Sequence, residues 1–329
     1  MRKLLFKILL ITLLTAALAI PSQAAIKKVA QTGLQFLKVD MSARAAAMGG
    51  AYMMVGDDAT AMFYNPAGIG NVTSDFDLFV NHTRWIADIN YSALGLVRNL
   101  GTWGALGVNA VICDYGDILG TRVSDNEQGY ESLGNLDVGA YAVGVTYAKA
   151  LTNKFSVGAT VKYASQRLGY NVLDDGSAKK NEVSGMVYDF GTIFYPGYKS
   201  LRFGMSVRNF SEEFEYEKES FELPLTFTIG FAMDVLDFMG EHENALTVSI
   251  DATHPRDYTE RLHFGAEYMY MDMFALRAGY KYNYDLEGLT AGLGLNYELP
   301  SGVILKVDYS YCTADVFDGI NRFSLGVSF

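Results

Sequence analysis

Residues 274–282 read FALRAGYKY, a stretch in which bulky or apolar side chains alternate with small or charged ones. The first set is Phe274, Leu276, Ala278, Tyr280 and Tyr282, and the second is Ala275, Arg277, Gly279 and Lys281. Because successive side chains of a strand point to opposite faces, this period of two predicts a β-strand with one apolar face.

The same alternation recurs along most of the chain, where we identify fourteen candidate strands. They cover 76–82, 90–98, 102–112, 136–150, 155–167, 184–195, 200–210, 224–235, 244–254, 260–270, 273–283, 288–298, 303–313 and 320–329. A soluble sheet can also have one apolar face, but side chains cannot fill a ring of fourteen strands, since about eight already enclose a filled interior. The pattern therefore predicts an all-β fold, a 14-stranded antiparallel transmembrane β-barrel whose apolar face meets lipid.

The opposite faces of these strands should then line the lumen with charges of both signs. Expected lumen-lining residues are Arg202, Arg208, Asp251, Glu267, Arg277, Lys281, Glu298, Lys306, Asp308 and Arg322. The longest connections, 113–135, 168–183 and 211–223, all follow odd-numbered strands. Since periplasmic turns are short and extracellular loops long, this parity places residue 329 on the periplasmic side.

The two ends of the chain predict the compartment. Residues 1–24 combine basic residues, an apolar run over 4–20 and a small-x-small site at 22–24, which indicates a cleaved signal peptide rather than a permanent anchor. The last strand ends in Phe329, as outer-membrane barrels do for recognition by the barrel-assembly machinery. We therefore expect the protein in the outer membrane of a Gram-negative-type bacterium, in contact with outer-membrane lipid.

Charge excludes one class of partner. The chain carries 26 Lys and Arg against 37 Asp and Glu, a net of −11, and removal of the three basic residues in 1–24 makes it −14. Such an acidic protein is not expected to bind nucleic acid. After residue 24, no apolar run approaches the ~18 residues that a membrane-spanning helix needs.

Residues 33–70 interrupt the strand pattern with GLQFLKVDMSARAAAMGGAYMMVGDDATAMFYNPAGIG. Ser42 should cap a helix over 43–48 that ends at Gly49-Gly50. Asp57 or Asp58 should cap a second over 59–64, which must stop at Asn65 because a proline follows. We expect residues 25–75 to form a periplasmic segment and a helical hatch in the lumen of the barrel, residues 76–329. The hatch residues singled out are Ser42, Arg44, Met48, Gly49, Gly50, Asp57, Asp58, Asn65, Pro66 and Gly68, the last three within a turn.

Arg44 stands alone among alanines, where a charge is costly unless it is paired. Expected partners are Glu267, Glu298 and Asp308, so that Arg44 would pin the hatch to the wall. The alternative is an arginine that remains solvated in the periplasm.

Nothing in the sequence suggests catalysis, a metal or another cofactor. The four histidines lack metal-ligand spacing, and His263 fits a lumen position. Cys113 and Cys312 would lie four strand spacings apart, too far for a disulfide, so two free thiols are expected. Gly95, Gly104, Gly107 and Gly144 could kink the wall into a lateral opening or serve ordinary packing.

The hatch motifs carry a resemblance to a known family. Ser42 to Ala51, Asp57-Asp58-Ala59 and Tyr64 to Ile69 resemble the amino-terminal signature of the PorV/PorQ family, which belongs with the FadL-like outer-membrane barrels. This resemblance implies a component of type IX secretion that accepts carboxy-terminal domains of secreted cargo and associates with the translocon barrel. FadL-like members instead admit hydrophobic small molecules past a hatch.

Three functions therefore stay open: an interaction component of type IX secretion, a passive channel for a hydrophobic ligand, and a mainly structural barrel. The first predicts an exposed aromatic patch on the loops or rim. The candidates are Phe210, Phe214, Tyr216 and Phe221.

Overall fold

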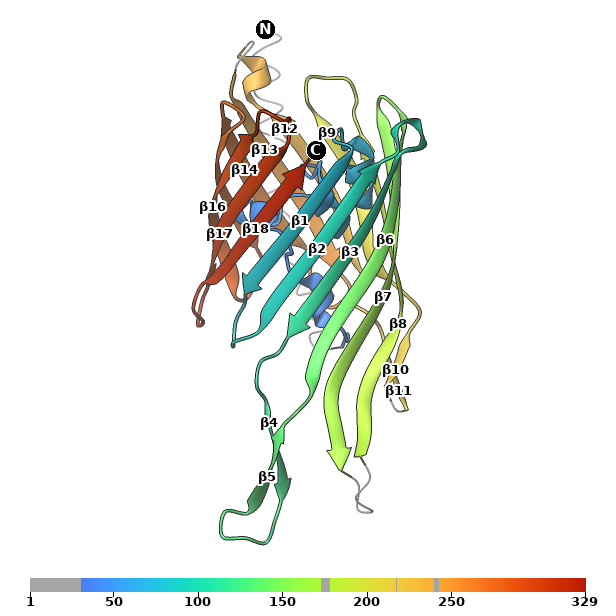
Figure 1. Ribbon diagram of the computed structural model, residues 1–329, viewed down its shortest axis with the longest axis vertical. Helices are drawn as coiled ribbons and strands as arrows, with labels where there is room; N and C mark the ends of the chain where they lie inside the picture. The colour runs from blue at the N-terminus through green and yellow to red at the C-terminus, as the bar shows by residue number, and fades with distance from the viewer. Residues whose placement is uncertain (1–30, 173–177, 217, 240–242) are drawn as a thin grey trace.

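The computed structural model describes residues 31–172, 178–216, 218–239 and 243–329. The predicted signal peptide and His242 lie outside these residues. Fourteen antiparallel strands close into one barrel (Figure 1), which confirms the fold predicted from the alternation. The barrel strands are β1 (Phe76–Arg84), β2 (Asn90–Asn99), β3 (Ala105–Asp114), β6 (Val138–Thr152), β7 (Phe155–Val172), β8 (Ala178–Phe194), β9 (Arg202–Phe210), β12 (Thr226–Asp234), β13 (Ala245–Pro255), β14 (Arg261–Tyr270), β15 (Phe274–Tyr282), β16 (Glu287–Glu298), β17 (Ile304–Ala314) and β18 (Ile320–Ser328).

Each barrel strand pairs with its neighbours in the chain, and β1 pairs with β18 to close the ring. Phe76 and Phe329 exchange backbone hydrogen bonds of 2.8 and 3.0 Å across this join, and their rings stack with centroids 5.3 Å apart. The final residue is thus tied to the first strand.

The alternation sorts side chains as expected. In β15, Phe274, Leu276 and Tyr280 are exposed on the outer face, whereas Arg277 and Lys281 are buried inside. The same holds in β17, where Leu305, Val307 and Tyr311 face outward and Lys306, Asp308 and Ser310 face inward. The outer wall is therefore an apolar surface suited to lipid. No described helix is long and apolar enough to cross a membrane.

The loops differ from the prediction because two of them contain strands of their own. The connection after β3 holds a hairpin of β4 (Leu119–Val123) and β5 (Tyr130–Asn135), which projects far beyond the ring (Figure 1). The connection after β9 holds β10 (Phe214–Tyr216) and β11 (Glu219–Phe221). β7 also continues beyond its predicted end, and β8 begins before its predicted start, both at the end of the barrel from which the hairpin projects. Long connections thus gather at one end of the barrel, which we treat as extracellular.

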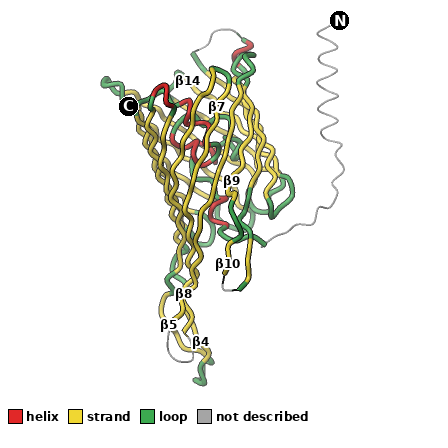
Figure 2. The backbone as a smooth tube through the Cα atoms, turned by 90° about the vertical axis from the view of Figure 1, so that its right-hand side faces the viewer, coloured by secondary structure: helices red, strands yellow, loops and turns green. Residues whose placement is uncertain are grey.

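Short helices of the amino-terminal segment fill the lumen (Figure 2). They are η1 (Gln35–Lys38), α2 (Ala43–Ala47), η2 (Ala59–Phe63) and η3 (Pro66–Asn71), of which α2 is an α-helix and the others are 3₁₀-helices. Two further 3₁₀-helices, η4 (Gly101–Trp103) and η5 (Leu236–Phe238), lie in periplasmic turns. Ser42 caps α2 by accepting from the Ala45 amide, and Gly49 and Gly50 leave the helix at φ of 65° and 77°. Asp58 caps η2 through the Thr60 amide. The expected turn at Asn65-Pro66 is instead the start of η3, because the Asn65 side chain caps the Ala67 amide.

Candidate functional site

The hatch is residues 31–75, and it lies against most of the inner wall. Helix α2 packs on β15 to β18, η2 on β1 to β3, and η3 on β6 to β8. Its alanines and methionines are almost completely buried, Ala43, Ala47 and Met48 being 0% exposed. Four short turns of helix cannot bury a core alone, so the barrel provides the surface on which they fold.

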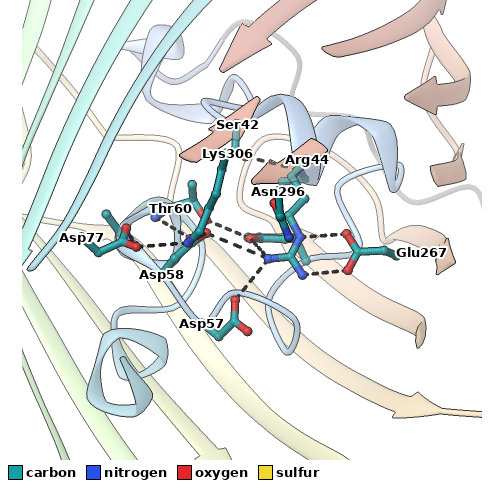
Figure 3. Close-up of polar contacts among 12 residues, drawn as sticks. Ser42, Arg44, Asp57, Asp58, Thr60, Asp77, Glu267, Asn296 and Lys306 are labelled. Atoms are coloured by element: carbon teal, nitrogen blue, oxygen red, sulfur yellow. Dashed lines mark hydrogen bonds and ion pairs between the residues drawn. The ribbon is translucent and has the colours of Figure 1, made fainter. Parts of the chain in front are cut away.

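Arg44 is the centre of the strongest link between hatch and wall (Figure 3). Its Nε and Nη2 donate to the two carboxylate oxygens of Glu267 on β14, at 2.8 and 2.7 Å, and its Nη1 donates to Asp57 at 3.1 Å. Glu267 also accepts from Arg277 on β15, whose Nη1 reaches Asp308 on β17 at 2.6 Å. With Arg44, the charges of three strands (β14, β15 and β17) form a ladder in which each buried charge has an opposite neighbour.

Of the three carboxylates expected to pair with Arg44, only Glu267 does so directly. Asp308 joins through Arg277. Glu298 is exposed at the periplasmic end of β16 and makes no ion pair with Arg44, so that pairing was wrong. The alternation assigns Glu298 to a face of the sheet but does not show how far along the barrel it lies from Arg44.

A second charged cluster joins η2 to the closing strands. Lys306 on β17 lies 3.3 Å from Asp58 of the hatch and 3.1 Å from Asp77 on β1. Asp77 in turn accepts the Ala59 amide at 2.8 Å. Burial would raise the pKa of Asp58, but the positive charges of Lys306 and Arg44 outweigh it and lower that pKa.

A third cluster holds the hatch on the extracellular side of α2. Lys281 on β15 bonds Asp40 at 2.7 Å and Glu287 at 2.9 Å, and Arg322 on β18 donates to the Asp40 carbonyl at 3.2 Å. Although burial favours the protonated form, Lys281 and Arg322 hold the pKa of Asp40 below its usual range. Closer to the extracellular end, Lys38 forms an ion pair of 2.9 Å with Asp257, which lies in the β13–β14 loop.

Wall side chains also bind the backbone of the hatch directly. Ser324 accepts the Ala43 amide at 2.9 Å, Thr290 donates to the Ala47 carbonyl at 2.8 Å, and Asp251 accepts the Met53 amide at 3.0 Å. Arg202 and Arg208 donate to the carbonyls of Met54 and Phe63. Backbone groups that the short helices leave free are thus satisfied by the barrel.

Glycines of the wall leave room for the hatch. A Cβ on Gly279 would overlap the backbone of Met48 and Gly49, and one on Gly292 would lie 2.5 Å from the Ala47 Cβ. Gly95 and Gly107 face Met62 of η2 in the same way. The strand register runs without a bulge through Gly95, Gly107 and Gly144, and Gly104 lies in the turn before β3, so these glycines pack and do not kink the wall.

The predicted aromatic patch is not a continuous exposed surface. Phe214 is only 7% exposed, because its ring packs against Gly185 of β8, while the ring of Phe221 packs against Gly33. Tyr216 and Phe221 are partly buried against the same core. Phe210 alone is well exposed, on the outer face of β9. Sequence reasoning missed this because an apolar residue in a loop reads the same whether it points to solvent or to the hatch.

Cys113 and Cys312 are free and buried, as expected from their separation around the ring. His263 is a lumen residue whose Nε2 lies 2.8 Å from the Tyr284 hydroxyl. Within the part of the chain that the structure describes, no group of three His, Cys, Asp or Glu side chains is arranged to hold a metal ion.

A cavity of about 280 Å³ lies between the hatch and the extracellular ends of the strands. Hatch residues Lys38, Asp40 and Met53 form its inner boundary, and Trp85, Arg261 and Tyr284 lie toward its outer end. Lys38, Asp40 and Asp77 were missed as functional positions. Lys38 and Asp40 stand outside any strand pattern, and Asp77 is one inward position among many.

Residues 60–319 match the model of a family described as type IX secretion system membrane protein PorP/SprF. The match starts inside η2, so most of the motif that resembles PorV/PorQ lies outside it, and membership in PorV/PorQ is not confirmed. No curated protein matches the chain.

Similar solved structures are hydrocarbon channels and a FadL homologue. The CymD monoaromatic hydrocarbon channel has a TM-score of 0.59 at 15% identity, covering 91% of this chain and 99% of that one. The toluene transporter TodX of Pseudomonas putida gives 0.56 at 14%, covering 86% and 96%. A FadL homologue of Pseudomonas aeruginosa gives 0.53 at 13%, covering 86% and 96%. At these identities the likeness establishes a shared FadL-like barrel and nothing about the ligand.

Proposed function

Since the chain belongs to the PorP/SprF family of type IX secretion membrane proteins, we propose that it is an interaction component of that system, with a role in cargo handling or attachment at the outer membrane. Its partners would be the translocon barrel and the carboxy-terminal domains of secreted proteins. The observation that carries this proposal is the set of ion pairs and hydrogen bonds that join the hatch to the wall. A barrel whose lumen is filled and bonded to the wall on many sides is suited to presenting a surface, not to passing a molecule through its axis.

The alternative is a FadL-like passive channel for hydrophobic small molecules. The similar structures favour it, since they include a monoaromatic hydrocarbon channel and a toluene transporter. Passage would require movement of a hatch held by the ladder at Arg44, the cluster at Lys306 and the cluster at Lys281. The cavity above the hatch also exposes charged and hydroxyl groups, which a hydrocarbon cannot satisfy.

A disulfide between hatch and wall separates the two functions. A Cβ built on Gly95 of β2 lies 3.5 Å from the Cβ of Ala59, within the range of about 3.5–4.5 Å that disulfides adopt. We expect the double variant Ala59→Cys/Gly95→Cys, oxidised in the outer membrane, to support type IX secretion as well as the reduced form does. The wild type treated with the same oxidant is the control, since Cys113 and Cys312 cannot pair.

Loss of secretion on oxidation, restored by a reductant, would contradict a static hatch. A second test is a mild-detergent pull-down from the native outer membrane, followed by mass spectrometry. Recovery of a very large barrel with secreted proteins that share a carboxy-terminal domain supports the secretion role. Recovery of this barrel alone with co-purified lipid or fatty acid supports the channel.

A further inference from the structure

A groove lies on the outer face of the barrel, where β3 ends before its neighbours do. After Asp114 the chain leaves β3 for the β4–β5 hairpin, whereas β6, β7 and β8 extend further toward the extracellular side (Figure 1). The last paired residues of β3 and β6 are Cys113 and Ala140. The groove at this step has a volume of about 430 Å³ and is lined by residues 112–114, 138–141, 165, 167 and 182.

Gly139 of β6 keeps the groove open. It pairs with Arg167 of β7, and the pairing of Cys113 with Ala140 places Asp114 of β3 at the same height on its other side. Apart from its chain neighbours, a Cβ on Gly139 would meet only the Cys113 carbonyl oxygen, 3.8 Å away. Gly139 is not among the glycines with a positive φ, so the backbone does not require a glycine there. The missing side chain therefore leaves space between Asp114 and Arg167.

The groove lies at the edge of the apolar outer surface. On its membrane side Ile112 is 57% exposed, and Tyr141 and Tyr163 are neighbours on the outer face, with ring centroids 6.3 Å apart. One step further along the same face, toward the extracellular side, stand Arg167 and Glu182, which are paired across β7 and β8. Since aromatic residues mark the membrane interface, the groove lies at the level of the lipid headgroups and continues the lipid-covered wall.

The two sides of the groove carry opposite charges. Asp114 is exposed on the β3 side. The side chain of Arg167, on the β7 side, is 40% exposed and its Nη2 lies 2.7 Å from Asp137. This pair is exposed and therefore weak, and it needs only part of the five N–H donors of a guanidinium. Because neighbouring strands are about 4.8 Å apart, the backbones of Asp114 and Arg167 are roughly 10 Å apart across Gly139.

A ligand between these side chains therefore needs a positive group at one end and a negative group at the other. A headgroup with phosphates alone would meet the carboxylates of Asp114, Asp137 and Glu182. A headgroup with amines alone would meet Arg167. The place of the groove on the lipid-covered wall, together with its charges, favours a zwitterionic lipid.

We propose that this groove binds an ethanolamine phospholipid, with its phosphate on Arg167, its ammonium on Asp114 and its acyl chains along Ile112 and Tyr141. A volume of about 430 Å³ would hold roughly fourteen water molecules at about 30 Å³ each, which is enough for the headgroup. This proposal does not depend on the secretion role.

The test is native mass spectrometry of the purified full barrel, released from detergent that contains equal amounts of four lipids. They are phosphatidylethanolamine, phosphatidylcholine, phosphatidylglycerol and lipid A. We expect one phosphatidylethanolamine to stay bound at activation energies that remove the other lipids. The choline headgroup has the same charges but no N–H donors, so it should be held less strongly. Equal retention of the four lipids, or preferred retention of another one, would overturn the proposal.

Variants then locate the site. Gly139→Leu fills the groove and Arg167→Gln removes the cation, and each should lower the bound fraction of phosphatidylethanolamine about tenfold. Asp114→Asn should also lower it, although it keeps the oxygen that accepts the Gly116 amide at 3.0 Å. Ala252→Leu adds bulk to the outer face of β13, far around the ring, and is the matched control.

Different gel migration of heated and unheated samples shows which variants fold. Arg167→Gln keeps the test decisive if Gly139→Leu does not fold. Retention equal to that of the parent in either of these two variants, when folded, would overturn the proposal.

Discussion

Replacement of Arg44 by methionine tests how the hatch is held. Methionine keeps most of the side-chain volume but removes two charge-assisted hydrogen bonds to Glu267, at 2.8 and 2.7 Å. Each such bond contributes about 1.5–3 kcal/mol, and Glu267 keeps its contact with Arg277, so we expect local opening of the hatch to become about 3 kcal/mol easier. At 1.36 kcal/mol for each factor of ten, this corresponds to amide exchange about 150-fold faster.

The assay is hydrogen exchange with mass spectrometry on the barrel in lipid nanodiscs, read in peptides that cover residues 42–58. Arg44→Lys should give a smaller increase, since an ammonium keeps the charge but not the paired bonds to the carboxylate. Arg122→Met is the control, because Arg122 and Glu131 form an exposed pair in the β4–β5 hairpin and such pairs contribute only about 0–1 kcal/mol. Unchanged exchange of residues 42–58 in Arg44→Met would refute the ladder as the main link between hatch and wall.

Three further predictions concern the wall, the hairpin and pH. Gly279→Ala should destabilise hatch docking by about 1–3 kcal/mol, because the new methyl group meets the backbone at Met48 and Gly49. Gly288→Ala is the control, since the nearest atom to its new methyl group would be 3.4 Å away, and it should change thermal stability by less than about 0.5 kcal/mol. Replacement of residues 117–135 by a short Gly-Ser turn should leave the barrel able to fold, since β3 pairs directly with β6. The folded barrel should still migrate differently from the heated one in gel electrophoresis, and loss of that difference would contradict the prediction. The lowered pKa values of Asp40 and Asp58 contribute stability that is fully present above the ordinary value of about 3.9 and is lost as pH falls through the lower folded-state values. The difference in hatch protection between the wild type and Asp58→Asn, corrected for intrinsic exchange, should thus be constant from about pH 7 to 5, and a change of that difference within the window would count against this account of the Asp58 ion pairs.

The barrel could be predicted from sequence because its determinant is local and repeated. The period of two assigns each side chain to lipid or lumen, and all fourteen strands appear close to their expected positions. The caps Ser42 and Asp58 were equally predictable, since a cap depends on residues within one helical turn.

The site was less predictable because its contacts join residues more than two hundred positions apart. Glu267, Glu298 and Asp308 look alike in sequence, and only the depth of the hatch in the lumen decides that Glu267 meets Arg44. The inward fold of Phe214 has the same origin, since it depends on where the hatch begins its path. The hatch motif predicted a type IX secretion protein, but it resembles PorV/PorQ, whereas the family whose model matches is PorP/SprF.

The hatch also spans the join between the first and last strands. Its Ala59 amide binds Asp77 of β1 at 2.8 Å, and its Ala43 amide binds Ser324 of β18 at 2.9 Å, while Ser324 itself donates to Asn81 of β1 at 2.9 Å. Separation of β1 from β18 would break these bonds together with the strand pairing. A sideways exit into the bilayer at this join therefore cannot open independently of the hatch, and a mechanical pull on residues 42–59 would be transmitted to the closing strands as well as to β14 through Arg44.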